Sequence, residues 1–244
     1  MAGLRLYDDF KRVLADYKVS DRAKRALDGL KLVIMVAPTS TGRNTIIDKL
    51  HQKADHYYFI VSDTTRIPQV RDGKLEANGV QYSFRSEEDM LADLKAGEFL
   101  EAALIHDQQV SGISIRELEK AKHRDKIAIT DVEIIGADNI MRAKPDTMAI
   151  FVVPPSFEEW QNRIRSRGHM NEQEFKNRLL SADKELVAAI EHDYYQFVIA
   201  DDLERTVGMI DAIATGQSNQ AENQKGRQLI KQIHQQLQVY LTGS

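Results

Sequence analysis

The chain has 244 residues, a formal net charge of −4 and no cysteine. Without cysteine there are no disulfides, thiolate metal sites or cysteine nucleophiles, and the composition suits a reducing cytoplasm. The mild negative charge and the lack of any apolar run near ~18 residues predict no nucleic-acid or membrane partner. The scattered histidines show no metal-ligand spacing, and the charged N-terminus does not fit a signal peptide.

The first 30 residues predict a helical extension. Leu6, Phe10, Val13 and Tyr17 recur at helical spacing, and Ser20 is suited to cap a short second helix.

Short apolar runs then alternate with amphipathic helices. The predicted strands are LVIMVA, YYFIVS, VQYSF, EFLEAALI, KIAIT, TMAIFVV and QFVIA. Buried strands separated by helices predict an α/β fold with a mainly parallel sheet. The runs VQYSF and EFLEAALI, with one helix between them, predict a small mixed sub-sheet. Capping boxes at Ser114–Glu117 and Ser156–Glu159, and a near version at Ser86, predict three helix starts.

The composition shifts after residue 215, where the chain becomes rich in glutamine. Ile230, Ile233, Leu237 and Tyr240 still form an apolar stripe, which predicts a C-terminal helix over 216–244. The periodicity fits a helix that packs back on the domain, and it also fits a dimerisation or partner helix. We therefore expect a monomer, or a homodimer formed through this helix.

The stretch VAPTSTGRNTII, residues 36–47, lies between a predicted strand and a predicted helix. A loop before a helix offers backbone N–H groups and the positive end of the helix dipole to phosphates. The strict phosphate-loop pattern fails, because Ala37, Arg43 and Asn44 replace the first glycine, the lysine and the hydroxyl residue.

Several separated motifs follow in a recognisable order. They are VSDTTRIP, NGVQYSF, GEFLE, TDVEIIGA, IFVVPPSFEEWQNRIRSRG, RLLSADKEL and FVIADDLE. Together they make residues 31–215 resemble the guanylate kinase family. The resemblance implies a P-loop NTPase-like three-layer α/β/α core with a mainly parallel sheet. It also implies a small mixed β subdomain for GMP at about 62–115 and a helical lid at about 163–190, between a helical extension at 1–30 and the C-terminal helix.

The implied activity is transfer of phosphate from ATP to GMP, giving ADP and GDP, with Mg²⁺. In the family's loop pattern Ala37 and Pro38 fit, and Thr45 supplies the hydroxyl and a magnesium contact. The departures are Ser40 for a glycine and Arg43 for the lysine. Arginine is planar and longer than lysine, and Ser40 adds a Cβ where glycine is wanted for positive φ, so we expect weaker donor binding or alignment. The implied ATP-binding residues are Pro38, Thr39, Ser40, Thr41, Gly42, Arg43, Asn44 and Thr45.

On the acceptor side, the resemblance implies that Ser62, Arg66 and Tyr82 hold the GMP phosphate. Gln69 stands where a second phosphate arginine is usual, and four extra residues before Tyr82 make Arg71 a candidate replacement. Arginine suits this task because it binds two phosphate oxygens at once.

The resemblance implies that Glu101 and Asp131 read the guanine N–H donors. In the neighbouring VSGIS segment, Ser111 and Ile113 replace the family's tyrosine and hydroxyl residue, which puts base selectivity in question. Ser114 is interpreted as a helix cap.

The resemblance also implies catalytic roles for Arg43 and for an acid and three arginines. Glu133 would lie near the metal and the reacting phosphates, and Arg163, Arg167 and Arg178 would be lid arginines that stabilise transition-state charge.

The sequence leaves three functions open. The first is a nucleoside monophosphate kinase of the guanylate kinase type. The second is a catalytically degenerate module that binds GMP or a phosphorylated peptide, and the third is a nucleotide sensor without turnover.

Overall fold

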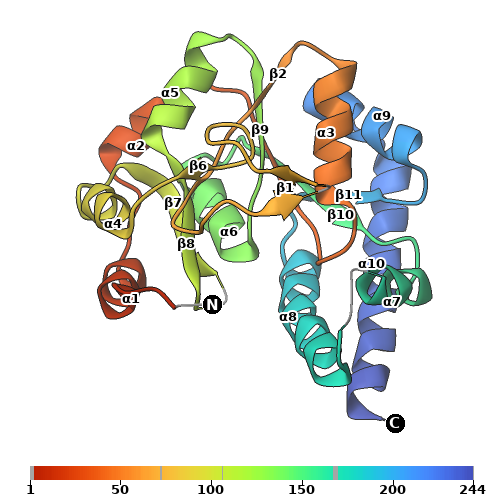
Figure 1. Ribbon diagram of the computed structural model, residues 1–244. Helices are drawn as coiled ribbons and strands as arrows, with labels where there is room; N and C mark the ends of the chain where they lie inside the picture. Colours follow the sequence, from red (N-terminus) through yellow and green to blue (C-terminus); the bar gives the residue numbers. More distant parts are fainter. Residues whose placement is uncertain (1–2, 72, 106, 167–169, 244) are drawn as a thin grey trace. The chain divides into compact units, whose positions relative to one another are not determined.

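The computed structural model describes residues 3–71, 73–105, 107–166 and 170–243 (Figure 1). The chain forms two compact units. Unit 1 comprises Met1–Leu32, His56–Thr130 and Ile135–Thr147, and unit 2 comprises Val33–Asp55, Asp131–Ile134 and Met148–Ser244.

Unit 1 contains a mixed sheet with the strand order β6-β3-β8-β7. Its strands are β3 (Asp63–Thr64), β6 (Ser83–Phe84), β7 (Phe99–Ile105) and β8 (Gln109–Ser114). β3 pairs parallel with β6 and antiparallel with β8, and β7 and β8 are antiparallel, which confirms the predicted mixed sub-sheet.

The remaining elements of unit 1 are two parallel strands, a hairpin and helices. β2 and β9 pair in parallel, and β4 and β5 pair antiparallel. The bounds are β2 (Tyr57–Phe59), β9 (Ile127–Asp131), β4 (Val70–Arg71), β5 (Lys74–Leu75), α1 (Tyr7–Ala15), α2 (Asp21–Leu27), α4 (Glu87–Lys95), α5 (Ile115–His123) and α6 (Ile134–Ala143).

The N-terminal extension belongs to the core of unit 1. Phe10 on α1 is fully buried in a cluster with Met90, Leu94, Phe99 and other apolar residues. Tyr17 donates a hydrogen bond from its hydroxyl to the Phe99 carbonyl at 2.7 Å. α1 is therefore fixed to both α4 and β7.

The predicted helix caps hold at Ser20, Ser86 and Ser156, whose side chains accept hydrogen bonds from the N–H groups three residues on. Ser114 is the N-cap residue of α5, which confirms the predicted helix start, but the predicted capping box with Glu117 does not form. Ser114 precedes α5, but its buried hydroxyl has no hydrogen-bond partner among the described residues. The carboxylate of Glu117 accepts instead from the Tyr58 hydroxyl at 3.0 Å and from Lys120 at 2.7 Å, so it is drawn away from the cap.

Unit 2 is built on three parallel strands in the order β11-β10-β1. These strands are almost wholly apolar and buried, as parallel strands covered on both faces require. The bounds are β1 (Leu32–Val36), β10 (Met148–Val153), β11 (Tyr195–Ile199), α3 (Arg43–Lys53), α7 (Phe157–Arg165), α8 (Glu172–Glu191), α9 (Leu203–Ala214) and α10 (Gln220–Thr242).

The C-terminal helix α10 packs against β11, α8 and α7 (Figure 1). Ile230, Ile233 and Leu237 of the predicted stripe are fully buried, while Tyr240 is 42% exposed. The Asn223 side chain accepts a hydrogen bond from the Phe197 N–H on β11 at 2.8 Å. A Cβ on Gly226 would lie 2.5 Å from the Phe197 Cβ, so this close approach requires glycine.

No helix within the described ranges is both long and apolar enough to cross a membrane.

Candidate active site

The loop between β1 and α3 has two residues with left-handed backbone. Ser40 has a φ of 65° and Gly42 a φ of 103°, which confirms the expectation that a positive φ is needed at Ser40. Thr41 closes the turn, donating from its hydroxyl to the Pro38 carbonyl at 2.7 Å. The Ser40 hydroxyl is buried and has no hydrogen-bond partner among the described residues. A serine held in this way costs conformational free energy, which is typical of backbone kept for function.

The first turn of α3 presents its backbone N–H groups at the end of this loop. The helical ladder begins with the Ile46 N–H donating to the Gly42 carbonyl at 3.1 Å. The N–H groups of Arg43, Asn44 and Thr45 come before Ile46 in the first turn, where backbone N–H groups have no helical carbonyl to bind and can bind an anion. The Asn44 and Thr45 side chains are exposed.

The Arg43 guanidinium lies at the segment after β9. Its Nη1 donates to the Val132 carbonyl at 3.2 Å, its Nε lies 3.6 Å from Asp131 Oδ2, and its Nη2 lies 3.8 Å from Glu133 Oε1. The Val132 N–H in turn donates to the Met35 carbonyl of β1 at 3.1 Å, which fixes this segment to the strand that precedes the loop. Two predicted site acids thus meet the arginine that replaces the lysine.

A third acid joins this group from α8. Burial raises the pKa of Glu185 to about 8, the charge of Glu133 and a hydrogen bond with it add to the rise, and Arg43 opposes it. Glu185 Oε2 is buried without a hydrogen-bond partner among the described residues. Glu185 therefore carries a proton at neutral pH. Its place in the site was not predicted, although it lies two helical turns after Arg178 and so shares its face.

Two side chains of α7 donate hydrogen bonds to backbone carbonyls of the loop between β1 and α3. Trp160 is fully buried, and its indole Nε1–H donates to the Thr39 carbonyl at 2.8 Å. Arg163 donates through Nη1 to the carbonyls of Thr41 and Ala200, both at 3.4 Å. In this structure a predicted lid arginine therefore binds the loop backbone. Trp160 was not among the predicted site residues.

The other two lid arginines are placed differently. Arg178 pairs with Glu174 one turn earlier on α8 at 2.9 Å. Arg167 lies outside the described residues.

In unit 1, Arg66 and Tyr82, two of the residues predicted to hold the GMP phosphate, lie side by side. The Arg66 guanidinium carbon lies 4.7 Å from the centroid of the Tyr82 ring and 5.6 Å from that of Phe84. The same guanidinium forms two parallel hydrogen bonds to Glu76, at 2.6 and 2.9 Å. The Glu76 side chain is only 1% exposed. Glu76 was missed because a single acid in a hairpin carries no spacing signal.

Ser62 and Arg71, the other two predicted phosphate residues, lie on either side of Arg66 in the sequence. Ser62 is half-buried, and its carbonyl accepts from the Ser83 N–H at 2.9 Å. The Gln69 N–H donates to Glu76 at 2.9 Å. Arg71 lies on β4, and its side chain is outside the described part of the structure.

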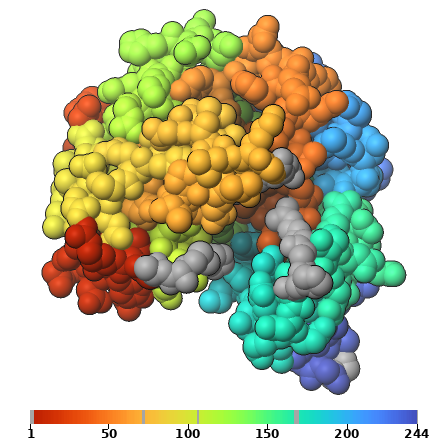
Figure 2. Space-filling model, in the orientation of Figure 1, coloured from red at the N-terminus to blue at the C-terminus, as the bar shows by residue number. Residues whose placement is uncertain are grey.

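The hairpin that follows Arg66 carries exposed apolar side chains. Ile67, Val70, Leu75 and Val80 are between 58% and 79% exposed. This orange-to-gold segment lies on the face seen in Figure 2. Nothing among the described residues covers it.

The two predicted guanine acids belong to different units. Glu101, on β7, is 8% exposed, and a Cβ on Gly136 of α6 would lie 2.8 Å from its Oε2. Asp131 is the residue at Arg43. In the VSGIS segment, Ser111 donates to the Thr64 hydroxyl at 2.8 Å and Ile113 is buried, so Ile113 offers no polar group here.

No group of three or more potential metal-ligating side chains occurs among the described residues. Mg²⁺ usually binds one or two protein groups together with substrate phosphates and water. The exposed Thr45 hydroxyl at the helix start fits that mode.

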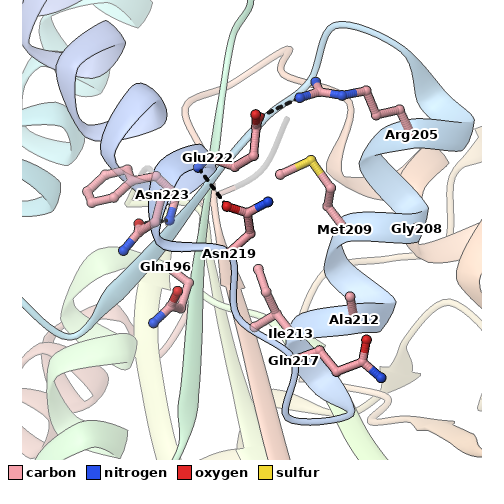
Figure 3. A pocket seen from close by; sticks show the side chains of 11 residues that line it. Gln196, Arg205, Gly208, Met209, Ala212, Ile213, Gln217, Asn219, Glu222 and Asn223 are labelled. Atoms are coloured by element: carbon pink, nitrogen blue, oxygen red, sulfur yellow. Dashed lines mark hydrogen bonds and ion pairs between the residues drawn. The ribbon is translucent and has the colours of Figure 1, made fainter.

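A cavity of about 250 Å³ lies between β11, α9 and the start of α10 (Figure 3). None of the predicted site residues lines it. The two charged residues that line it form an ion pair, with Arg205 Nη2 2.5 Å from Glu222 Oε2. Asn219 accepts from the Glu222 N–H at 3.2 Å. This cavity is therefore not the candidate active site.

Comparison with known proteins gives one consistent family. A family model described as "Guanylate kinase" matches residues 29–216. Guanylate kinases of Corynebacterium diphtheriae and Synechococcus sp. are 35% and 36% identical over 187 residues, which are 76% and 75% of this chain and 95% and 81% of theirs. A guanylate kinase of Nostoc sp. is 33% identical over 205 residues, 84% of this chain and 99% of its own.

The fold has a matching solved structure. The crystal structure of guanylate kinase from Anaplasma phagocytophilum aligns with a TM-score of 0.56 and 24% identity, covering 80% of this chain and 89% of that one. This likeness confirms the predicted α/β fold with a mainly parallel sheet. With the family match over 29–216, it shows that the chain belongs to the guanylate kinase family and is a guanylate kinase-like phosphotransferase.

Proposed function

We propose that this protein transfers the γ-phosphoryl group of ATP to GMP, giving ADP and GDP. The observation that carries this proposal is the loop before α3, where Ser40 is held in a left-handed conformation that suits glycine. The chain keeps this costly turn and places a helix start directly after it, and both features suit the phosphates of a nucleotide. In this proposal residues 31–215 form the kinase domain, with the GMP subdomain at 62–115 and the lid at 163–190.

On the donor side, the N–H groups from Gly42 to Thr45 would bind phosphate oxygens of ATP. The Thr45 hydroxyl would hold Mg²⁺, whose chemistry when bound is to neutralise charge on the phosphates. The lid arginines Arg163, Arg167 and Arg178 would stabilise the charge that develops during transfer. Arg163 already lies at the loop carbonyls, where α7 fixes its position.

On the acceptor side, Arg66, Tyr82 and Ser62 would bind the GMP phosphate, with Arg71 as a further cation. The bidentate contact with Glu76 holds the Arg66 guanidinium in one orientation, so less rotamer entropy is lost on binding. Glu101 and Asp131 would accept hydrogen bonds from the guanine edge.

A second candidate is a degenerate member that binds nucleotide without efficient turnover. The observation that favours it is the position of Arg43, whose guanidinium lies at Asp131, Val132 and Glu133. A cation held by two acids contributes less charge to the phosphates than the lysine it replaces.

A coupled ADP-release assay with ATP, Mg²⁺ and GMP tests the two candidates, using the native chain and Arg43→Lys. Turnover by the native chain supports the kinase. Turnover only by Arg43→Lys identifies a degenerate relative, and absence of turnover in both disproves the transfer reaction.

Calorimetry tests the acceptor pocket separately. We expect GMP to bind at least about tenfold more tightly than AMP, because adenine lacks the N1–H and N2 amino donors that the carboxylates of Glu101 and Asp131 would accept from guanine. Equal affinity for GMP and AMP would contradict the roles of Glu101 and Asp131.

A further inference from the structure

We propose that Tyr240, near the end of α10, is a positioning residue for the loop between β1 and α3. The expected effect of Tyr240 on the KM for ATP rests on the proposed function, but its expected effect on the environment of Trp160 does not. α10 begins after residue 216, where the match to the guanylate kinase family model ends.

The last turns of α10 are fixed on α8 by both apolar and polar contacts. Leu237 is fully buried. Gln238 donates to the Asp183 carboxylate at 2.5 Å, and His234 Nε2 lies 3.1 Å from the same carboxylate. Figure 1 shows α10 running beside α8, and α7 also contacts it. Tyr240 is thus carried by a well-anchored helix.

The ring of Tyr240 bridges α7 and α8. Its centroid lies 6.0 Å from that of Phe157 on α7 and 6.2 Å from that of Phe175 on α8, both in edge-to-face geometry. Such edge-to-face pairs are favourable because the ring quadrupoles are complementary.

Arg165 reinforces the bridge. Its guanidinium carbon lies 3.8 Å from the Phe175 ring centroid, and its Nη2 lies 3.5 Å from the Tyr240 hydroxyl. Its Nη1 also pairs with Glu172 at 2.7 Å, so one side chain at the end of α7 contacts both α8 and α10.

The bridge continues to the loop through Trp160. The centroid of the Phe157 ring lies 6.1 Å from that of Trp160, and the indole Nε1–H donates to the Thr39 carbonyl. Arg163, one turn later on α7, binds the Thr41 carbonyl. The orientation of α7 therefore sets two carbonyls of the loop, and Tyr240 contacts α7 through Phe157 and Arg165.

Trp160 makes this testable, because it is the only tryptophan in the chain. We compare Tyr240→Ala and Tyr240→Phe with the control Val239→Ala, which changes a 57% exposed neighbour on the same helix. Without nucleotide, Tyr240→Ala should shift Trp160 emission to longer wavelength and raise acrylamide quenching about twofold, because local opening exposes the indole. Tyr240→Phe keeps the ring and should resemble the native chain, as should Val239→Ala.

In the coupled assay, Tyr240→Ala should raise the KM for ATP about tenfold, since small misplacement of a binding loop is costly. The KM for GMP should stay unchanged. A merely structural role would lower the melting temperature without this selective effect. Tyr240 is 42% exposed, so we expect Tyr240→Ala to fold. The variant Phe157→Leu removes the ring between Tyr240 and Trp160, and the same emission and quenching measurements test it.

Unchanged emission and quenching in both Tyr240→Ala and Phe157→Leu would overturn the inference, whatever the turnover. Equal rises in the KM for ATP and GMP would also overturn it. A native chain without turnover, combined with altered Trp160 emission in Tyr240→Ala, would reject the proposed reaction and support the positioning role.

Discussion

Glu185 on α8 feels the negative charge of Glu133 after β9, and the Arg43 guanidinium, which lies 3.8 Å from Glu133, opposes the effect of that charge on the pKa of Glu185. Two acids in this arrangement favour a state in which one of them is protonated, because like charges at close range repel. Burial makes Glu185 the protonated partner, and its pKa rises to about 8.

This pair predicts a pH-dependent stability. Between about pH 5 and 8 the folded chain keeps a proton on Glu185 that the unfolded chain releases, so the free energy of unfolding falls as pH rises. Glu185→Gln mimics the protonated acid and removes this dependence. The native chain should lose about 1 kcal/mol per pH unit relative to Glu185→Gln between pH 6 and 8. Urea unfolding of both proteins across this range measures the difference.

The matched control is Glu191→Gln, at the exposed end of the same helix. It should leave the pH dependence of the native chain unchanged. Parallel stability curves for the native chain and Glu185→Gln would contradict the raised pKa.

Ser40→Gly should stabilise the protein by about 1 kcal/mol, because glycine adopts positive φ without strain and the buried hydroxyl disappears. Ser40→Ala removes the hydroxyl but keeps the strained backbone, so its gain should be smaller. Chemical unfolding at constant pH compares the three chains. A loss of stability in Ser40→Gly would mean that the hydroxyl has a partner that outweighs the strain.

Glu76→Gln should destabilise the protein by about 3 kcal/mol, because it leaves the nearly buried Arg66 guanidinium without a compensating charge. Arg66 is 10% exposed, so little water is available to replace the carboxylate. Affinity for GMP should also fall, measured by calorimetry. The control Asp9→Asn breaks an exposed pair with Arg12 and should cost less than about 0.5 kcal/mol. Similar losses in the two variants would show that the buried pair contributes no more than a surface pair.

Phe10→Ala should destabilise unit 1 by about 3–5 kcal/mol, because it opens a cavity in a cluster shared by α1, α4 and β7. Thermal unfolding compares it with Leu180→Ala, whose side chain is 46% exposed on α8 and should cost little. A small effect of Phe10→Ala would show that the N-terminal helix detaches without loss to the core.

The sequence located the long parallel strands because β1, β10 and β11 are continuous apolar runs. β8 was not among the predicted strands, since serine and glycine interrupt its pattern. The structure explains the glycine: a Cβ on Gly112 would lie 2.5 Å from the Glu101 carbonyl of the neighbouring strand. Such an approach depends on pairing between strands, which local propensity does not encode.

The contacts of the candidate site residues could not be predicted from the sequence. Motif order placed Arg43, Arg66 and Tyr82 in the candidate site, but no spacing rule links Arg43 to Val132, 89 positions away. Glu185 was missed for the same reason, since it meets Glu133 and Arg43 only when distant segments fold together. Glu76 contacts Arg66, only ten positions away, and was missed because a single acid in a hairpin carries no spacing signal. The resemblance suggested a lid role for Arg163, whereas its contact with the Thr41 carbonyl is a property of the packed helix.

The hydrogen bond from the Phe197 N–H to Asn223 has a practical consequence for making shorter forms of this protein. β11 is the outermost strand of its sheet, and α10 covers the side that has no neighbouring strand. A chain cut at residue 216, where the family match ends, would keep every motif of the kinase but leave this strand unprotected. Unprotected edges recruit strands from other molecules, so the truncated protein should precipitate or self-associate where the whole chain does not.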